Sequence, residues 1–402
     1  MGNRALDGLT VVELGHRFAA SYAAKLMADL GADVIKVEPP AGDPVRGLPP
    51  FAGGQPHPEK SGTFLYLNCN KRGVTLDVAD PRGCAVLDRL LGEADILVHD
   101  YPAATAEAAG ITWERISGLN PRLIMASITP FGLSGPYRNF NAYDLTLASA
   151  GGWTTVNGMP GDPSMPPLRA FGHQTAYQAG VNAAVATMGA AVWRLKSGKG
   201  QHIEVSAQEC ISSILELTYV TWPYMGVEVV RYGQRPMHPI DFFECKDGWI
   251  FVLCLEEKQW RSFVEMMGNP EWAEWEVFAN AFVRASNWDA LKPFIAEWVA
   301  GWTVDELYRA AQAKRIPFAP VSTMTDLLDS PHLKARGFFA EIAHPQAGTA
   351  KYPGAPYKLA GTPWEIRSPA PMLGQHNAEV LGERLGMTAD ELNELRTAGV
   401  TS

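Results

Sequence analysis

The sequence has few cysteines and no excess of positive charge, and both shortages exclude classes of protein. Its five cysteines are scattered and form no CxxC pair, which argues against a disulfide framework and a zinc knuckle. Lysine and arginine total 34 against 43 aspartates and glutamates, a net charge of −9, so we expect no nucleic-acid partner and no membrane surface. The opening residues lack an apolar signal core, which predicts a cytoplasmic protein.

Long hydrophobic runs are also scarce. Only residues 171–193 lack Asp, Glu, Lys and Arg over a length that could span a bilayer. This stretch carries His173, Gln174, Gln178 and Asn182 among many small residues, and no second such stretch exists. We therefore expect a helix buried in protein and no membrane span.

Several catalytic motifs are missing as well. The sequence contains no GxGxxG, GxxxxGK[ST], GxSxG or HExxH pattern. Their absence weakens the dinucleotide oxidoreductase, P-loop NTPase, serine hydrolase and zincin interpretations together.

The chain is nevertheless rich in core-forming residues, and its length predicts more than one core. It has 402 residues, of which 47% are hydrophobic and 19% charged. Its first half alternates short β-branched runs with helical patterns, which is typical of a parallel sheet with right-handed crossovers. We predict an α/β fold with a doubly wound, Rossmann-like large domain, with strands near 9–14, 33–38, 74–78, 95–100 and 122–129 and helices near 19–32 and 81–94.

A different pattern begins near residue 225. Residues 242–254 predict a hairpin that turns at 246–248, and helical patterns follow at 256–268, 287–302 and 304–316. We therefore predict a large domain over 1–224, a small α+β domain over 225–325 and a C-terminal segment over 326–402 that returns to the large domain.

A polar cluster and several strand ends could carry chemistry. Residues 68–73, which include Asn70, Lys71 and Arg72, precede the expected strand at 74–78 and suit either a phosphate or a solvated turn. His16 and the pair Asp100 and Tyr101 follow strand ends, where open α/β sheets bind ligands, although each also fits a structural role.

Two helix starts carry further candidates. Asp144, which follows Tyr143, opens a predicted helix and fits an N-terminal cap as well as a site residue. The polar residues 172–178 open the uncharged helix, where they either solvate its end or line a site.

Several sequence blocks, in order, resemble one family. They are LDGLTVVELGHRFAASYAAKLMADLGADVIKVEPPAGDPVR, LNCNKRGVTLDV, HDYPAATAEAAGITWERISGLNPRLIMASITPFG, SGKGQHIEVSAQE, CKDGWIFV, IPFAPVSTMTDLLDSPHLKARGFF and PMLGQHNAEVLGERLG. The family is the class III CoA-transferases of the CaiB/BaiF type, which include formyl-CoA, carnitine and benzylsuccinate CoA-transferases. The resemblance covers essentially the whole chain.

The resemblance implies a fold, a reaction and a partner. It implies an interlocked dimer, either a homodimer or a hetero-oligomer with a paralogue. It implies transfer of CoA from an acyl-CoA donor to a carboxylic acid through an aspartyl anhydride and an aspartyl-CoA thioester. CoA is then a substrate, and neither a permanently bound cofactor nor a metal is expected.

The resemblance also implies site residues. Those expected at the active site are Tyr143, Asp144 and Gln174. Those expected to bind CoA are Arg17, together with His16, Phe18 and Ala19 near the pantetheine, Asn70, Lys71 and Arg72 near the phosphates, and Asp100 and Tyr101 near the adenine. Two positions that are often basic in the family are Pro39 and Ala108 here. Lys71 and Arg72 are then expected to make more of the contacts with the CoA phosphates, or Arg46 is expected to contribute to them.

The main departure concerns the nucleophile. The family's aspartate lies four residues before the glycine of the uncharged helix, and four residues before Gly180 stands Ala176. Two explanations are open: an aspartate replaced by design, which we favour because the flanking residues match, or a naturally silent CoA-binding subunit that pairs with an active paralogue. The related 2-methylacyl-CoA racemases need a histidine beside Asp144 and a carboxylate at 176, and this chain has neither.

The acyl donor and acceptor are not specified by any motif. Large or polar residues at five positions predict a pocket for an acid larger than formate, either aromatic or dicarboxylic. These are Tyr143, His173, Gln174, Trp222 and Tyr224.

Overall fold

The computed structural model describes residues 4–158, 164–231 and 237–402, which divide into two compact units. The larger unit comprises the described residues up to Asn157, Pro167–Val229 and Phe338–Ser402, and the smaller is built mainly from Val230–Gly337. The changes of unit therefore fall near 229 and 337, whereas the sequence predicts a small domain over 225–325. The three predicted domains stay a prediction, because a compact unit is not necessarily a part of the chain that folds alone.

The larger unit is organised around a six-stranded parallel sheet, which confirms the predicted α/β class. The strand order is β3-β2-β1-β4-β5-β6, the order of a doubly wound dinucleotide-binding sheet. Short β-branched runs form these strands because both of their faces are buried. The bounds are β1 Thr10–Leu14, β2 Asp33–Glu38, β3 Lys71–Thr75, β4 Ile96–His99, β5 Ile124–Thr129 and β6 His202–Ser206.

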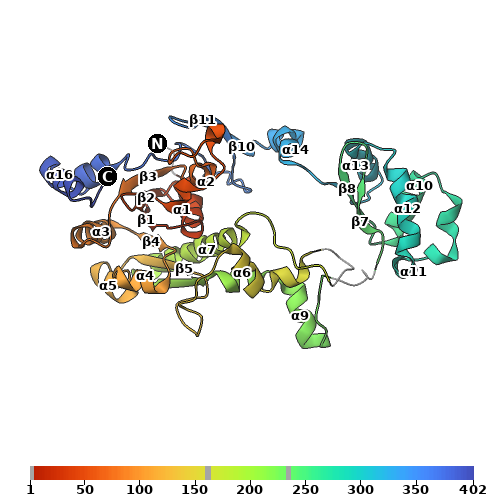
Figure 1. The fold of residues 1–402 in the computed structure, drawn as a ribbon, viewed down its shortest axis with the longest axis horizontal. Helices are drawn as coiled ribbons and strands as arrows, with labels where there is room; N and C mark the ends of the chain where they lie inside the picture. Colours follow the sequence, from red (N-terminus) through yellow and green to blue (C-terminus); the bar gives the residue numbers. More distant parts are fainter. Residues whose placement is uncertain (1–3, 159–163, 232–236) are drawn as a thin grey trace. The chain divides into compact units, whose positions relative to one another are not determined.

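Helices cover both faces of this sheet (Figure 1). On one face the alanine-rich helices α1 and α7 pack over valine and isoleucine side chains of β1, β4 and β5, and on the other α3, α5 and the C-terminal segment pack over leucine and valine side chains. The helices of this unit are α1 Ala19–Asp29, α2 Gly62–Leu67, α3 Pro81–Glu93, α4 Ala103–Ala108, α5 Trp113–Leu119, α6 Asp144–Ala150, α7 Gln174–Ser197, α8 Ala207–Ser213, α9 Glu216–Met225 and α16 Ala389–Thr397.

The third strand begins earlier than its sequence indicates. We predict a strand at 74–78 with the polar cluster ahead of it, but β3 spans Lys71–Thr75, so half of the cluster lies inside the strand. That prediction is wrong because β2 fixes the register: Val34 pairs with Lys71 and Glu38 with Thr75. Buried partners neutralise the charge of Lys71, so this lysine can lie within a buried strand.

Most of the uncharged stretch lies in α7, a 24-residue helix whose first charged residue is Arg194. One face, which includes Thr175, Ala179 and Ala183, is buried, whereas Val185 and Leu195 on other faces are exposed. Within this chain, the expectation of a helix buried in protein thus holds for one face of α7. Among the described helices none is long and apolar enough to cross a membrane.

The smaller unit has its own core. The predicted hairpin is present as β7 and β8, closed by a hydrogen bond from Cys245 N to Gly248 O at 2.7 Å. The helical patterns form α10, α12 and α13; tryptophan and phenylalanine side chains of α10 and α12, with Leu307 and Ala311 of α13, share one core with the hairpin. Its elements are β7 Ile240–Glu244, β8 Trp249–Leu253, β9 Ala319–Pro320, α10 Glu257–Met266, α11 Ala281–Ser286, α12 Trp288–Val299, α13 Val304–Ala313, α14 Met324–Asp329 and α15 Pro331–Ala335.

The C-terminal segment returns to the N-terminal strands of the larger unit (blue in Figure 1). After the hairpin of β10 Phe339–His344 and β11 Gly348–Pro353, the chain runs along β3. There Gly73 O accepts from His376 N at 2.9 Å, and Thr75 N donates to Asn377 Oδ1 at 2.9 Å. These bonds satisfy backbone groups at the otherwise open edge of the sheet.

Candidate functional site

The topological switch point of the sheet lies between β1 and β4, where ligands bind in open α/β sheets. Asp100, which follows β4, accepts hydrogen bonds from His16 N at 2.6 Å and Ala20 N at 3.3 Å. Its carboxylate therefore anchors the turn from β1 into α1. Burial raises the pKa of Asp100, and the two backbone bonds partly offset this effect. The ring of Tyr101 lies 5.7 Å from that of His16.

The first turn of α7 lies beside this turn. Ala176 is the third residue of α7 and is half-buried against the cluster that contains Phe18. One turn later, a Cβ at Gly180 would lie 2.7 Å from Ala19 O. Only glycine lets α7 approach α1 so closely, and this approach brings position 176 next to Phe18.

A carboxylate from another helix caps this turn. Asp144, the first residue of α6, accepts from Thr175 N at 2.9 Å and from Thr175 Oγ1 at 2.5 Å. Arg169 approaches its second oxygen at 3.4 Å. Asp144 is thus a helix cap, as one of its two interpretations from the sequence predicts. It caps α7, however, and not α6, the helix that it begins. A carboxylate at 176 would share this positive helix end.

Aromatic rings border the same place. The rings of Phe18 and His173 are stacked with their centroids 3.8 Å apart, and Tyr143 is exposed under the guanidinium of Arg17. Burial lowers the pKa of His173, with Asp144 opposing and Arg169 adding to the shift. Gln174 is exposed and donates to Phe171 O at 3.3 Å. Imidazole, amide and aromatic side chains therefore lie around the start of α7, where Ala176 packs against the cluster that contains Phe18.

The predicted phosphate cluster is engaged inside the protein. Lys71 is fully buried, and its Nζ donates to Glu13 Oε2 at 2.7 Å, Ser21 O at 2.8 Å and Asn68 Oδ1 at 2.9 Å. Lys36 donates to the other Glu13 oxygen at 2.8 Å. Burial lowers the pKa of Lys71 to about 8, although Glu13 opposes the shift. The two lysines share one buried carboxylate.

The neighbours of Lys71 are engaged as well. Asn70, at φ 64°, donates to Asp29 and Glu365 O and accepts from the backbone of 367 and 368. Arg72 forms ion pairs with Asp33 and Glu379. The structure therefore does not bring Asn70, Lys71 and Arg72 together around one open space.

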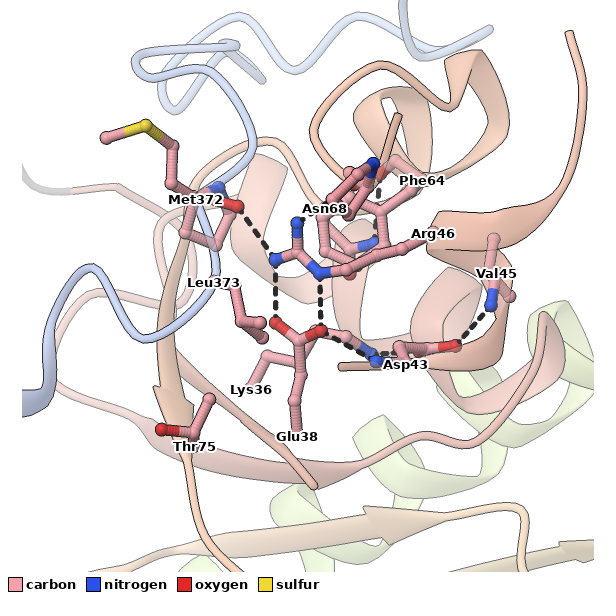
Figure 2. A network of polar contacts seen from close by, with 12 residues as sticks. Lys36, Glu38, Asp43, Val45, Arg46, Phe64, Asn68, Thr75, Met372 and Leu373 are labelled. Atoms are coloured by element: carbon pink, nitrogen blue, oxygen red, sulfur yellow. Dashed lines mark hydrogen bonds and ion pairs between the residues drawn. The ribbon is translucent and has the colours of Figure 1, made fainter. Parts of the chain in front are cut away.

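Arg46 forms a second buried network (Figure 2). Its guanidinium donates to Glu38 at 2.7 and 2.8 Å, to Glu59 at 2.7 Å and to Pro371 O at 3.0 Å. Figure 2 shows the fork facing the Glu38 carboxylate with Phe64 beside it, and the guanidinium carbon lies 3.7 Å from that ring. All three nitrogens of this guanidinium therefore donate to groups within the chain.

Sequence reasoning missed two groups of side chains. Glu13 and Lys36 lie within apolar strands, and a charge inside a buried strand is the signal that could have found them. His99, Ser127 and His202 form a hydrogen-bonded row across β4, β5 and β6, with Ser127 Oγ 2.7 and 2.8 Å from the imidazoles. These three are spread over 100 residues, and no local pattern joins them.

Two other predicted positions lie on a different helix. Trp222 and Tyr224 are on α9, where no residue is buried within the described chain. No described group of three or more His, Cys, Asp or Glu side chains is placed to hold a metal ion.

Comparison with known proteins agrees with this architecture. The model of CoA-transferase family III matches residues 6–377. The chain is 30% identical to a formyl-CoA:oxalate CoA-transferase of Streptomyces avermitilis over 99% of both chains. It is 32% identical to the beta subunit of a succinyl-CoA–L-malate CoA-transferase of Chloroflexus aurantiacus over 98% of both.

A solved structure shows the same fold. A CaiB/BaiF family protein from Brucella suis superposes with a TM-score of 0.86 at 29% identity, covering 95% of this chain and 99% of the other. Members of the family use CoA thioesters as substrates and need no permanent cofactor. The switch-point sheet, the full-length family match and these relatives lead to one conclusion: the chain belongs to CoA-transferase family III and to the CoA-transferase class of enzymes.

Proposed function

We propose that this chain is a class III CoA-transferase scaffold that binds CoA thioesters and lacks the nucleophile at position 176. The observation that carries the proposal is the environment of Ala176: the third residue of α7, packed near Phe18, beside the turn that follows β1. A carboxylate there would lie at a positive helix end next to the ligand edge of the sheet.

The reaction proposed for an aspartate at 176 has four steps. Its carboxylate attacks the donor thioester carbonyl, the C–S bond breaks, and CoA leaves as the thiolate. The thiolate attacks the aspartyl carbonyl of the mixed anhydride and expels the donor acid. The acceptor carboxylate then attacks this enzyme thioester, releases the thiolate and forms a second anhydride. Attack of the thiolate on the acceptor's acyl carbon gives the new acyl-CoA and the free aspartate.

The residues around position 176 have supporting roles in this proposal. Asp144 fixes the first turn of α7 through Thr175, and the neutral ring of His173 stacks on Phe18. We propose that CoA enters along the β1–α1 turn, with His16, Phe18 and Ala19 near its pantetheine and Asp100 and Tyr101 near its adenine. Asn70, Lys71 and Arg72 reach its phosphates only if their present partners are exchanged.

The substrate class is an acid with two carboxylates. Of the groups in the names of the two relatives compared above, oxalate, malate and succinyl derive from dicarboxylic acids and formyl from a monocarboxylic acid. The exposed polar and cationic groups near position 176 support the same class.

The decisive experiment restores the carboxylate. The unmodified chain, Ala176→Asp and the isosteric control Ala176→Asn are incubated with succinyl-CoA or acetyl-CoA and a panel of acids, and CoA esters are separated by mass-resolved chromatography. We expect a new acyl-CoA only from Ala176→Asp, at a rate on the order of 10⁴-fold or more above the other two. Equal rates from all three would contradict the proposal.

A second candidate is a silent subunit of a hetero-oligomer. It is favoured by the alanine at 176 together with a relative that is itself named as a beta subunit. This candidate predicts CoA binding by all three proteins and no activity from Ala176→Asp unless a paralogous chain is added. Absence of CoA binding in every form would overturn both candidates.

The proposed partner is a second chain of the same fold in an interlocked dimer. Helix α9 supports it, because Leu217 and Tyr224 are 72% and 86% exposed and none of the helix's residues is buried within the described chain. An apolar helix of this kind is stable in water only when another surface covers it.

A further inference from the structure

Arg17 has no anionic partner among the described residues. Its side chain is exposed, its guanidinium carbon lies 5.1 Å from the centre of the Tyr143 ring, and its Nη1 is 3.5 Å from Ala142 O. No carboxylate of the described chain lies within ion-pair distance of it. Because most of its five N–H donors are unused, Arg17 can still bind an anion through its planar fork.

The other arginine near this place is already engaged. Arg169 approaches Asp144 at 3.4 Å and donates to Ala170 O at 3.1 Å and Gly172 O at 2.7 Å. The Asp144 carboxylate in turn is held by Thr175. Of these two guanidinium groups, Arg17 is therefore the one free to receive a ligand.

Two short series of side-chain contacts connect Arg17 to position 176. Through Tyr143, which it covers, it reaches Asp144 and the first turn of α7. Through its neighbour Phe18 it reaches the ring of His173 and the cluster against which Ala176 packs. The cation is thus linked through a few residue contacts to position 176, where, in the proposed reaction, the acyl group of the thioester must lie.

The chemistry of that acyl group selects the anion. In the thioester of a dicarboxylic acid one carboxylate is bound to sulfur and the other stays free, whereas a monocarboxylic acid leaves no charge. The phosphates of CoA are separated from the thioester by the whole pantetheine arm, so a cation beside the acyl group is far from them. Arginine binds carboxylate through two parallel charge-assisted hydrogen bonds.

We propose that Arg17 binds the free carboxylate of the acyl group and sets a preference for dicarboxylic over monocarboxylic acids. This inference rests on the proposed function, since it needs a CoA thioester at position 176. It reassigns Arg17, which the family resemblance places among the CoA-binding residues, to the acid.

The test compares two thioesters with four-carbon acyl groups that differ in one carboxylate. Succinyl-CoA, butyryl-CoA and free CoA are titrated by calorimetry into the unmodified chain, whose alanine at 176 prevents turnover. The same titrations are made with Arg17→Gln, with Arg17→Lys, which keeps the charge without the fork, and with the exposed control Arg309→Gln in the smaller unit. Circular dichroism melts establish that each variant is folded.

We expect Arg17→Gln to weaken succinyl-CoA binding about tenfold to a hundredfold and Arg17→Lys to weaken it less. Binding of butyryl-CoA and CoA stays unchanged, as does all binding by Arg309→Gln. An equal loss for all three ligands would overturn the inference and return Arg17 to the CoA site. No loss for any ligand would also overturn it. Failure of the unmodified chain to bind any of the three would instead overturn the proposed function.

Discussion

Asp144 acts on a helix that it does not belong to. Its Oδ1 accepts both donors of Thr175 in the first turn of α7, so Asp144→Ala leaves a buried backbone N–H and a hydroxyl without a partner. We expect a loss of about 1 kcal/mol in the free energy of unfolding, measured by urea titration. Asp144→Asn keeps an acceptor and should lose less, and Asp305→Ala on the exposed first turn of α13 serves as the control. Equal effects of the three substitutions would contradict the assigned role.

Glu13 links the stability of the fold to pH. Burial raises its pKa, but Lys36 and Lys71 outweigh burial and lower it to about 2, compared with 4.5 for an ordinary glutamate. A carboxyl group whose pKa is lower in the folded state stabilises the fold above its unfolded pKa, and this stabilisation is lost as the pH falls through the folded pKa. We expect Glu13 to contribute roughly 3 kcal/mol that disappears between about pH 5 and pH 2.

Glu13→Gln measures this contribution. The variant keeps the shape of the side chain but leaves two buried ammonium groups with one fewer anion, so it should be less stable at neutral pH by about 3 kcal/mol or more. Its free energy of unfolding, from urea titrations at several pH values, should also depend less on acid. Glu341→Gln on the exposed face of β10 is the matched control. A variant with the acid dependence of the unmodified chain would refute the assignment.

At the scale of elements, the crossing of α1 and α7 decides where position 176 lies. A Cβ at Gly180 would meet Ala19 O at 2.7 Å and Tyr22 Cβ at 3.2 Å, whereas a Cβ at Gly189 on the same helix would meet nothing within 4 Å. Gly180→Ala should therefore destabilise the fold by about 1–3 kcal/mol, because the helices must separate. Gly189→Ala should stabilise it by about 0.5–1 kcal/mol through helix propensity. Thermal melts of the pair test this, and effects of the same sign would contradict the close crossing.

Local sequence patterns predicted the positions of some strands and helices better than those of others. The apolar runs of β1, β2, β4 and β5 were predicted within one or two residues, because strands buried on both faces must be continuously apolar. The start of β3 was misplaced, because its register depends on β2 and on the buried partners of Lys71. The exposed faces of α7 were also missed, since the lack of charge along the sequence does not reveal which faces are covered within one chain.

At the scale of the whole molecule, α9 predicts that the chain does not act alone. Its apolar side chains, including Trp222, are exposed along the helix, so we expect a dimer in sedimentation at micromolar concentration. Trp222→Glu should weaken it, because a charge would be placed in a dry interface. Leu119→Glu, on the α5 surface of the larger unit, is the control. A monomeric unmodified chain would contradict the proposed partner.

The sequence by itself determined the α/β class, the hairpin of the smaller unit, the family and the alanine at position 176, because each depends on residues close together along the chain or on ordered blocks. The tertiary structure decided the rest. It turned Lys71 and Arg46 inward, made Asp144 the cap of α7 and left Arg17 without an anionic partner in the part of the chain that the structure describes. Those outcomes depend largely on contacts between distant residues, such as Thr175 with Asp144, 31 positions apart, and Arg46 with Pro371, 325 positions apart; a side chain's partners at such separations are set by packing and register, which no local pattern encodes.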